Sequence, residues 1–379
     1  MTDTTRHPGT ATAARPAAPA TLDLEVWVWR GTIAESRHRL QAVAVDDDGA
    51  VLAATAAPDL VTSLRSAAKP FQLLPLVERG HADRWGFSEE ELAVMAASHA
   101  GTDRHLALVR GILARIGLVE SDLACGFHEP FDEAAAKSLR GRPDDRSPLY
   151  NNCSGKHAGM LALALAEGWP TTGYEKAAHP VQKLMLATVA EICGLPAAEV
   201  AVAVDGCNAC VFGVPLRAMA LGYARFAAAA AIGDARARAL ARIRAAMIAH
   251  PWATGGAGRL STELMERTGG RLVSKGGAEG LECIGVPERR LGLAIKCEDG
   301  QARGLAPAAI ALLERLGVLG EVEGARLLSL RRPVVRNYVG LEVGTLEVRL
   351  TGAGPRAGAI LPVANSAANP GRAQEPPTR

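Results

Sequence analysis

The chain has 379 residues, of which 42 are basic and 40 acidic, so its formal net charge is only +2. This balance provides neither the basic surface of a nucleic-acid-binding protein nor a polybasic membrane anchor. No apolar run reaches the roughly 18 residues that span a bilayer, and the N-terminus lacks the apolar core of a secretory signal. We therefore expect a cytoplasmic protein whose partners include neither nucleic acid nor membrane.

Chain length and cysteine count limit the possible domain organisation and disulfide content. The seven cysteines are odd in number and lack small-scaffold spacing, which suits reduced thiols or metal ligands better than disulfides. A chain this long favours one large domain with two lobes, which we place at residues 23–365. The Pro- and Ala-rich stretch 1–22 and the stretch 366–379 are expected to be disordered tails.

The first half of the chain predicts a small group of strands followed by helices. Alternating apolar residues indicate strands at 24–30, 40–45 and 50–55, the last two joined by the turn 46–49. Helices are then predicted from Ser66, from Ser88 with its capping-box pattern, and over 103–116, 159–167 and 180–193.

The second half continues with helices and returns to strands. A short buried strand is predicted at 201–204, followed by helices between 214 and 250, at 261–268 and at 305–316. A strand at 271–274 precedes a hairpin whose arms are 291–297 and 301–304. Strands at both ends with helices between them predict an α/β fold. An antiparallel sheet built from both termini would lie beside a helical lobe.

Ser66 and Lys69 form the stretch around which the chemistry is organised. At a spacing of three they share one face of a helix, where a lysine with a depressed pKa can take the serine proton. Taken alone, this spacing is more often an ordinary helix start with a surface lysine. Penicillin-recognising enzymes use the same Ser-x-x-Lys element, followed by Tyr-x-Asn and Lys-Thr/Ser-Gly. Here Tyr150-Asn151-Asn152 and Lys275-Gly276-Gly277 follow in that order.

A closer match comes from longer motifs. These are Ser66-Ala67-Ala68-Lys69-Pro70-Phe71-Gln72, Ala97-Ser98-His99, the block from Asn151 to Met160, Asp205-Gly206-Cys207, and the block from Lys275 to Gly280. Over about residues 24 to 350 the chain resembles the asparaginase II family, the rhizobial-type or class 3 L-asparaginases. The resemblance implies a fold like that of serine β-lactamases and glutaminases, hydrolysis of L-asparagine to L-aspartate and ammonia, and a homodimer.

Carried over residue by residue, the resemblance also implies the site. Ser66 with Lys69 would be the nucleophile and its base, and Ser98 with Lys275 would be a second Ser–Lys pair. A zinc site would be formed by Cys153, Lys156 and Cys207, with Asp205 close by. Because a lysine ligand must lose its proton, such a site should be pH-dependent and labile, and it need not be essential for turnover.

Physical chemistry adds two expectations to this site. Two lysines near one pocket depress each other's pKa, and burial acts in the same direction, so a neutral Lys69 could accept the Ser66 proton, directly or through Ser98. The backbone N–H of Ser66 at a helix start would be half of an oxyanion hole, with Gly276 or Gly277 as the other donor.

Several candidates keep a second interpretation. Arg65 could bind a substrate carboxylate or form a surface salt bridge, and Asp205 could bind the substrate ammonium or orient a metal ligand. His99 could act on substrate or only hydrogen-bond its loop. Without the resemblance, Cys153 and Cys207 read as small buried apolar residues. Tyr150 is expected to pack rather than to transfer protons.

The chain departs from the family pattern after Ser-His, where it has Ala100-Gly101-Thr102, and after Gly-Arg, where it has Leu260-Ser261-Thr262. These changes permit an altered side-chain selectivity. Two alternatives to an asparaginase therefore stay open: a penicillin-recognising serine acyltransferase or hydrolase, and a non-catalytic zinc- or thiol-binding protein on the same fold.

Overall fold

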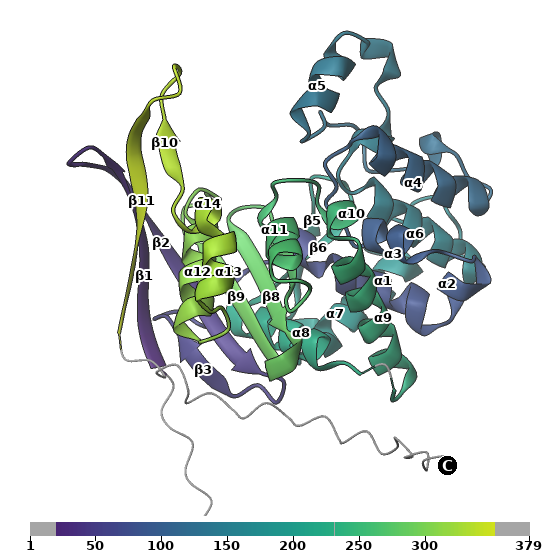
Figure 1. Ribbon diagram of the computed structural model, residues 1–379. Coiled ribbons are helices and arrows are strands. Elements are labelled where there is room, and N and C mark those ends of the chain that lie inside the picture. Colours follow the sequence, from purple (N-terminus) through teal and green to yellow (C-terminus); the bar gives the residue numbers. More distant parts are fainter. Residues whose placement is uncertain (1–19, 231, 353–379) are drawn as a thin grey trace, which may run out of the picture.

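The structure, a computed structural model, describes residues 20–230 and 232–352 (Figure 1). Residues 1–19 of the predicted N-terminal tail and the whole predicted C-terminal tail, 366–379, lie outside the described residues. Within the described ranges, no helix combines the length and the apolar character needed to cross a membrane.

An eight-stranded sheet in the order β10-β11-β1-β3-β2-β9-β8-β7 forms the larger half of the fold. Its strands are β1 (Ala20–Arg30), β2 (Ile33–Asp46), β3 (Val51–Ala54), β7 (Val273–Gly277), β8 (Leu281–Val286), β9 (Leu291–Cys297), β10 (Val334–Arg336) and β11 (Glu342–Gly352). Neighbours pair antiparallel, except for a short parallel contact between β1 and β3. Early and late strands thus meet in one sheet, as the sequence predicts.

A three-stranded sheet and most of the helices form the rest. The small sheet has the order β4-β6-β5, with β4 (Val61–Ser63), β5 (Ala201–Val204) and β6 (Cys210–Pro215). The α-helices are α1 (Lys69–Glu78), α2 (His81–Arg84), α3 (Glu89–Met95), α4 (Asp103–Arg115), α5 (Glu133–Arg140), α6 (Ser154–Ala166), α7 (Pro180–Ile192), α8 (Leu216–Ala228), α9 (Ala235–Ala249), α10 (Pro251–Thr254), α11 (Leu260–Arg267), α12 (Leu305–Arg315), α13 (Glu321–Arg326) and α14 (Leu328–Arg331). Short 3₁₀ turns are η1 (Arg65–Ala68), η2 (Glu120–Asp122), η3 (Pro143–Asp145), η4 (Pro148–Tyr150), η5 (Ala197–Glu199) and η6 (Pro287–Arg289).

The large sheet lies between two helical layers. Successive residues of β2 alternate in direction: Val43 and Val45 join the core of the helical lobe, whereas Ala42 and Ala44 join the core beneath α12. On the lobe side, α8 lies directly on β9. A Cβ at Gly292 would stand 1.9 Å from the Ala220 carbonyl oxygen, so only glycine permits this approach. Figure 1 shows α12 on one face and α8 on the other.

Three local predictions differ from the structure. Residues 301–304 form no strand, and β9 pairs instead with β8 and β2. The strand β5 is exposed rather than buried, because it is an edge of the small sheet. The helix predicted from Ser66 begins as the 3₁₀ turn η1 and becomes α-helical only at Lys69. The capping box at Ser88 is confirmed.

Candidate active site

Ser66 lies in a tight backbone turn between the small sheet and α1. The residue before it, Arg65, has a φ of +45°, a conformation that costs a non-glycine residue about 1–3 kcal/mol. The Ser66 side chain is half-buried, and neither its hydroxyl nor its N–H makes a hydrogen bond to a described residue. Ser66 therefore keeps both groups free at the start of a buried helix.

Ser98, just after α3, is the point at which two lysines meet. The Lys69 Nζ lies 3.0 Å from the Ser98 Oγ, and the Lys275 Nζ lies 2.9 Å from the same oxygen. All three residues are at most 4% exposed. The predicted partners Ser66 and Lys69 are adjacent on one helical turn, but the hydrogen bond that the structure records goes from Lys69 to Ser98.

The remaining contacts of the two amines are backbone carbonyl groups. Lys69 donates to the carbonyl oxygens of Ala97 at 2.5 Å and Asn152 at 3.3 Å, and Lys275 donates to that of Gly276 at 2.9 Å. Burial is the largest cause that lowers the pKa of Lys69. Burial, followed by the charge of Lys69, holds the pKa of Lys275 well below its usual value. The hydroxyl between them thus faces two amines whose pKa is lowered by burial.

A buried carboxylate holds the strand that carries Lys275. The Glu282 Oε1 accepts hydrogen bonds from the Ser261 hydroxyl at 2.7 Å and the Ser274 hydroxyl at 2.6 Å. The Ser261 Oγ in turn accepts the N–H of Gly276 at 2.9 Å. Burial raises the pKa of Glu282. Because the Gly276 amide already has this partner, Gly277 is the better candidate for a second oxyanion donor.

Cys153, Lys156 and Cys207, the three predicted metal ligands, are brought together next to Lys69. The Lys156 Nζ lies 3.0 Å from the Cys207 Sγ, and all three residues are at most 5% exposed. A hydrogen bond from Cys207 is the largest cause that holds the pKa of Cys153 well below its usual value. Burial lowers the pKa of Lys156, but the two sulfurs outweigh burial and raise it. Two sulfurs and one nitrogen are a donor set that zinc accepts once the amine has lost its proton.

Arg65 and Asp205 pair with each other rather than facing an open pocket. The Arg65 Nε lies 2.9 Å from the Asp205 Oδ1, which also accepts the N–H of Gly206 at 2.7 Å. The ion pair spans from η1 to the turn between β5 and β6, beside Cys207. Both residues are therefore in the site, but each neutralises the charge of the other.

The candidate His99 and the neighbouring His157 both hydrogen-bond other parts of the protein. His99 accepts the Gly101 N–H at its Nδ1, so its Nε2 carries the proton donated to the Ser154 Oγ at 2.8 Å. The His157 Nδ1 lies 2.7 Å from the hydroxyl of Tyr174. Burial holds the pKa of both imidazoles well below its usual value. His99 thus fixes the loop that carries Ser98.

A cavity of about 360 Å³ opens onto Ser98 and Lys275. Its other lining residues come mainly from the turn before α11, from β7 and from the start of α12: Thr254, Gly255, Gly258, Arg259, Leu260, Ser261, Gly276, Gly277, Leu281, Glu282, Ala302, Leu305, Ala306 and Leu330. Small-molecule sites have volumes of roughly 300–1,000 Å³, so the cavity suits a ligand of amino-acid size. We call it the Ser98 cavity.

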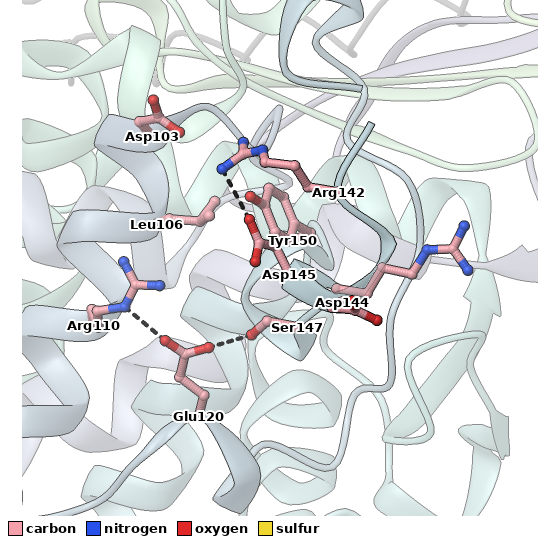
Figure 2. Close-up of a pocket in the computed structure, with 10 residues that line it drawn as sticks. Asp103, Leu106, Arg110, Glu120, Arg142, Asp144, Asp145, Ser147 and Tyr150 are labelled. Atoms are coloured by element: carbon pink, nitrogen blue, oxygen red, sulfur yellow. Dashed lines mark hydrogen bonds and ion pairs between the residues drawn. The ribbon is translucent and has the colours of Figure 1, made fainter. Parts of the chain in front are cut away.

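A second cavity, of about 520 Å³, lies between α4 and the segment that precedes α6 (Figure 2). Two ion pairs lie within it: Arg110 with Glu120 at 2.7 Å, and Arg142 with Asp145 at 2.9 Å. Tyr150 lines it with its ring, which agrees with a packing role. Neither serine–lysine pair reaches this cavity.

One further group of potential metal ligands occurs in the described part of the chain, formed by His38, Cys297 and Asp299. The Asp299 carboxylate is 2.7 Å from the His38 Nδ1, and it accepts a hydrogen bond from the Cys297 thiol at 2.9 Å. It also accepts the N–H of Gln301 at 2.9 Å. These contacts account for the group as a hydrogen-bonded turn after β9.

Sequence reasoning missed Arg259 and Glu282, which flank Lys275 in the Ser98 cavity. Glu282 lies in β8, a strand that the sequence did not predict, opposite Gly276 in the β7–β8 register. Arg259 belongs to the Gly-Arg turn before α11, and no local pattern distinguishes it from a surface arginine. A paired-strand prediction for 273–286 would have placed Glu282 beside Lys275.

Comparison with known proteins gives one clear family match. Two solved structures, described as "Crystal Structure Analysis of Mglu" and the same "in its native form", are similar at 15% identity and a TM-score of 0.41. The aligned parts cover 73% and 75% of this chain and 66% of the length of each of those chains, a likeness too low to bear on the site. No curated protein matches the chain by sequence. The model of the family described as L-asparaginase II matches residues 26–348, most of the chain, so the protein belongs to the L-asparaginase II family.

Proposed function

We propose that the protein is an amidohydrolase that converts L-asparagine to L-aspartate and ammonia through an acyl-enzyme on Ser66. The observation that carries this proposal is the convergence of two buried lysine amines on the Ser98 hydroxyl. One of these lysines, Lys69, follows Ser66 by three residues. A serine becomes a nucleophile only when a base takes its proton, and burial lowers the pKa of both amines.

In the first half of the reaction, the Ser66 Oγ attacks the side-chain amide carbon. Its proton passes to Lys69, directly or through Ser98. A neutral Lys69 donates its two N–H groups to the carbonyls of Ala97 and Asn152, which leaves its lone pair for the Ser98 proton. The oxyanion that forms would be held by the Ser66 N–H, and loss of one such donor typically costs about 10²–10³ in rate.

In the second half, the C–N bond breaks as the lysine–Ser98 relay returns the proton to the leaving nitrogen, which departs as ammonia. The ester on Ser66 is then attacked by water, whose proton follows the same relay, and L-aspartate is released with Ser66 restored. One set of groups serves as acid and base in turn.

Zinc at Cys153, Lys156 and Cys207 is part of this proposal. The group is buried, rich in sulfur and one residue from the Asn152 carbonyl that holds Lys69. When bound, the ion would stiffen this wall of the site. Its role is tested by measuring zinc content and ammonia release after chelation and in Cys153→Ser; release that persists without zinc would assign the ion to stability alone.

The remaining expectations are a homodimer, a cytoplasmic location, a small amide as the substrate, and kinship of the fold with serine β-lactamases and glutaminases. Size-exclusion chromatography with light scattering tests the first of these. Turnover of nitrocefin would favour the penicillin-recognising alternative. Zinc binding without ammonia from any amide would favour the non-catalytic one.

The deciding experiment compares wild type with Ser66→Ala on L-asparagine and L-glutamine. We expect ammonia from L-asparagine, and a loss of at least about 10³-fold in kcat for the variant. Thr62→Ala, on the preceding strand β4, is the matched control for a small hydroxyl lost outside the site. Full activity in Ser66→Ala would exclude this nucleophile.

A further inference from the structure

The Ser98 cavity holds one arginine that no carboxylate neutralises. Among the described residues, the Arg259 guanidinium forms no ion pair and no side-chain hydrogen bond; its recorded contact is the ring of Phe131, 5.0 Å from the guanidinium carbon. The cavity's carboxylate, Glu282, already accepts two serine hydroxyls. Arg65, for which the sequence left open a substrate carboxylate or a salt bridge, is paired with Asp205.

The backbone around Arg259 directs this side chain. Arg259 is the extended residue immediately before α11, and Gly258 before it has a φ of +74°. A Cβ added at Gly255 would stand 3.5 Å from the Arg259 Cβ and 2.7 Å from the Thr262 Oγ1, so the arginine stem fits closely over this glycine. Arg259 itself is exposed, and the recorded contact of its guanidinium is the stack on Phe131.

We propose that Arg259 binds the α-carboxylate of the substrate and restricts the enzyme to free amino-acid amides. This inference rests on the proposed function and adds to it the part of the substrate that does not react. A planar guanidinium matches a carboxylate through two parallel N–H···O bonds, and an unpaired one loses no existing ion pair when it does so. Lys275 is unsuited to this role, because its amine is bonded to Ser98.

The test pairs two substrates with four proteins. L-Asparagine and its tert-butyl ester carry the same side-chain amide, but the ester has no α-carboxylate. Ammonia release is measured for wild type, Arg259→Ala, Arg259→Lys and Arg146→Ala. Arg146 is the matched control, because its guanidinium also stacks on an aromatic ring, Phe127 at 5.5 Å, but lines the cavity of Figure 2.

We expect Arg259→Ala to lower kcat/KM for L-asparagine by about 10- to 100-fold, mainly through KM, since hydrogen bonds to charged groups have this strength. For the ester, Arg259→Ala and wild type should agree within about twofold. Arg259→Lys should lose less, and Arg146→Ala should match wild type on both substrates.

Equal losses on both substrates, or no loss on L-asparagine, would overturn the carboxylate role while leaving the proposed function intact. If wild type released ammonia from neither substrate, the proposed function itself would fail, and this inference with it. Arg259→Lys keeps the test decisive if Arg259→Ala does not fold. A folded Arg259→Lys that loses activity on L-asparagine but not on the ester still supports the carboxylate role.

Discussion

Two neighbouring regions of this molecule bury lysines to a similar depth, but they shift the lysine pKa in opposite directions. Lys69 and Lys275 meet a serine hydroxyl and backbone carbonyls, and burial lowers their pKa. Lys156 meets two sulfurs, and their charge raises its pKa in spite of burial. Burial alone therefore does not set the direction in which a lysine pKa shifts, because the charge of the groups in contact with the amine also contributes. The lowered pKa of Lys69 and Lys275 suits proton transfer, whereas the raised pKa of Lys156 suits an ammonium beside sulfur.

The largest effect should come from removing an amine at Ser98. We expect Lys69→Met and Lys275→Met each to lower kcat by about 10³-fold or more, because a general base and the chain that depends on it are lost together. The matched control is Lys296→Met, another buried lysine, which bonds only the carbonyls of Glu279 and Cys297. That variant should lose stability but keep kcat within a few-fold. Equal losses in all three would remove the distinction between the two kinds of lysine.

The pH profile should show the neutral amines directly. Lys69 and Lys275 can act as bases only when their amines are unprotonated, so kcat/KM should fall as pH decreases through the pKa of these amines. Because burial places that pKa below the usual lysine value of 10.5, the fall should lie well below pH 10.5. Initial rates from pH 5 to 10 in a constant-ionic-strength buffer measure it. A fall in kcat/KM centred near pH 10.5 would mean that these lysines are solvated, and it would contradict proton transfer by buried amines.

Glu282 offers a smaller effect that separates charge from positioning. In Glu282→Leu, the hydroxyls of Ser261 and Ser274 lose their acceptor in a buried site, which should cost about 2–4 kcal/mol of unfolding free energy. Glu282→Gln keeps an oxygen acceptor and should cost less. Urea unfolding gives the stabilities, and kcat/KM should fall in the same order because Lys275 loses its support. A leucine variant as stable as wild type would show that this network is dispensable.

The smallest effect should come from His105, which lies outside the relay. Burial lowers its pKa to about 4, from a usual 6.5, while it stacks on Trp252. The unfolded chain therefore binds a proton between pH 6.5 and 4 that the folded chain does not, so stability falls as pH falls through this window. The loss should reach about 2 kcal/mol at pH 5. In His105→Gln the urea-unfolding slope against pH should be shallower by nearly one proton; an unchanged slope would mean that His105 titrates normally.

Features of the fold and site that depend on neighbouring residues could be predicted from the sequence, whereas those that depend on contacts between distant segments could not. Local spacing drew attention to Ser66 and Lys69, but it did not by itself mark them as catalytic. The family resemblance suggested Ser98 and Lys275 and the group of Cys153, Lys156 and Cys207, and the structure brings each of these two sets together. The strands β8, β10 and β11 were missed. The strand β8 is buried on both faces and lacks alternation, whereas β11 pairs with the distant β1 and β10 is an edge strand that pairs only with β11. The predicted strand 301–304 was wrong, since Gly300 instead begins a turn into α12.

Side-chain partners were the least predictable feature. No local pattern states that Arg65 is neutralised by Asp205, 140 positions later, or that both lysines converge on Ser98. These contacts arise only when η1, α3 and β7 come together. The residue types at the site were thus readable from the sequence, but the distribution of charge among them required the fold.

The most direct test of the central claim is to locate the covalent intermediate. Wild type is mixed with L-asparagine, quenched in acid within the first turnovers, and analysed by intact mass and proteolytic mapping. We expect an aspartyl group on Ser66, absent in Ser66→Ala and still on Ser66, though formed more slowly, in Ser98→Ala. An aspartyl group on Ser98, with Ser66→Ala still acylated, would contradict this mechanism and make Ser98, which both lysines already contact, the nucleophile.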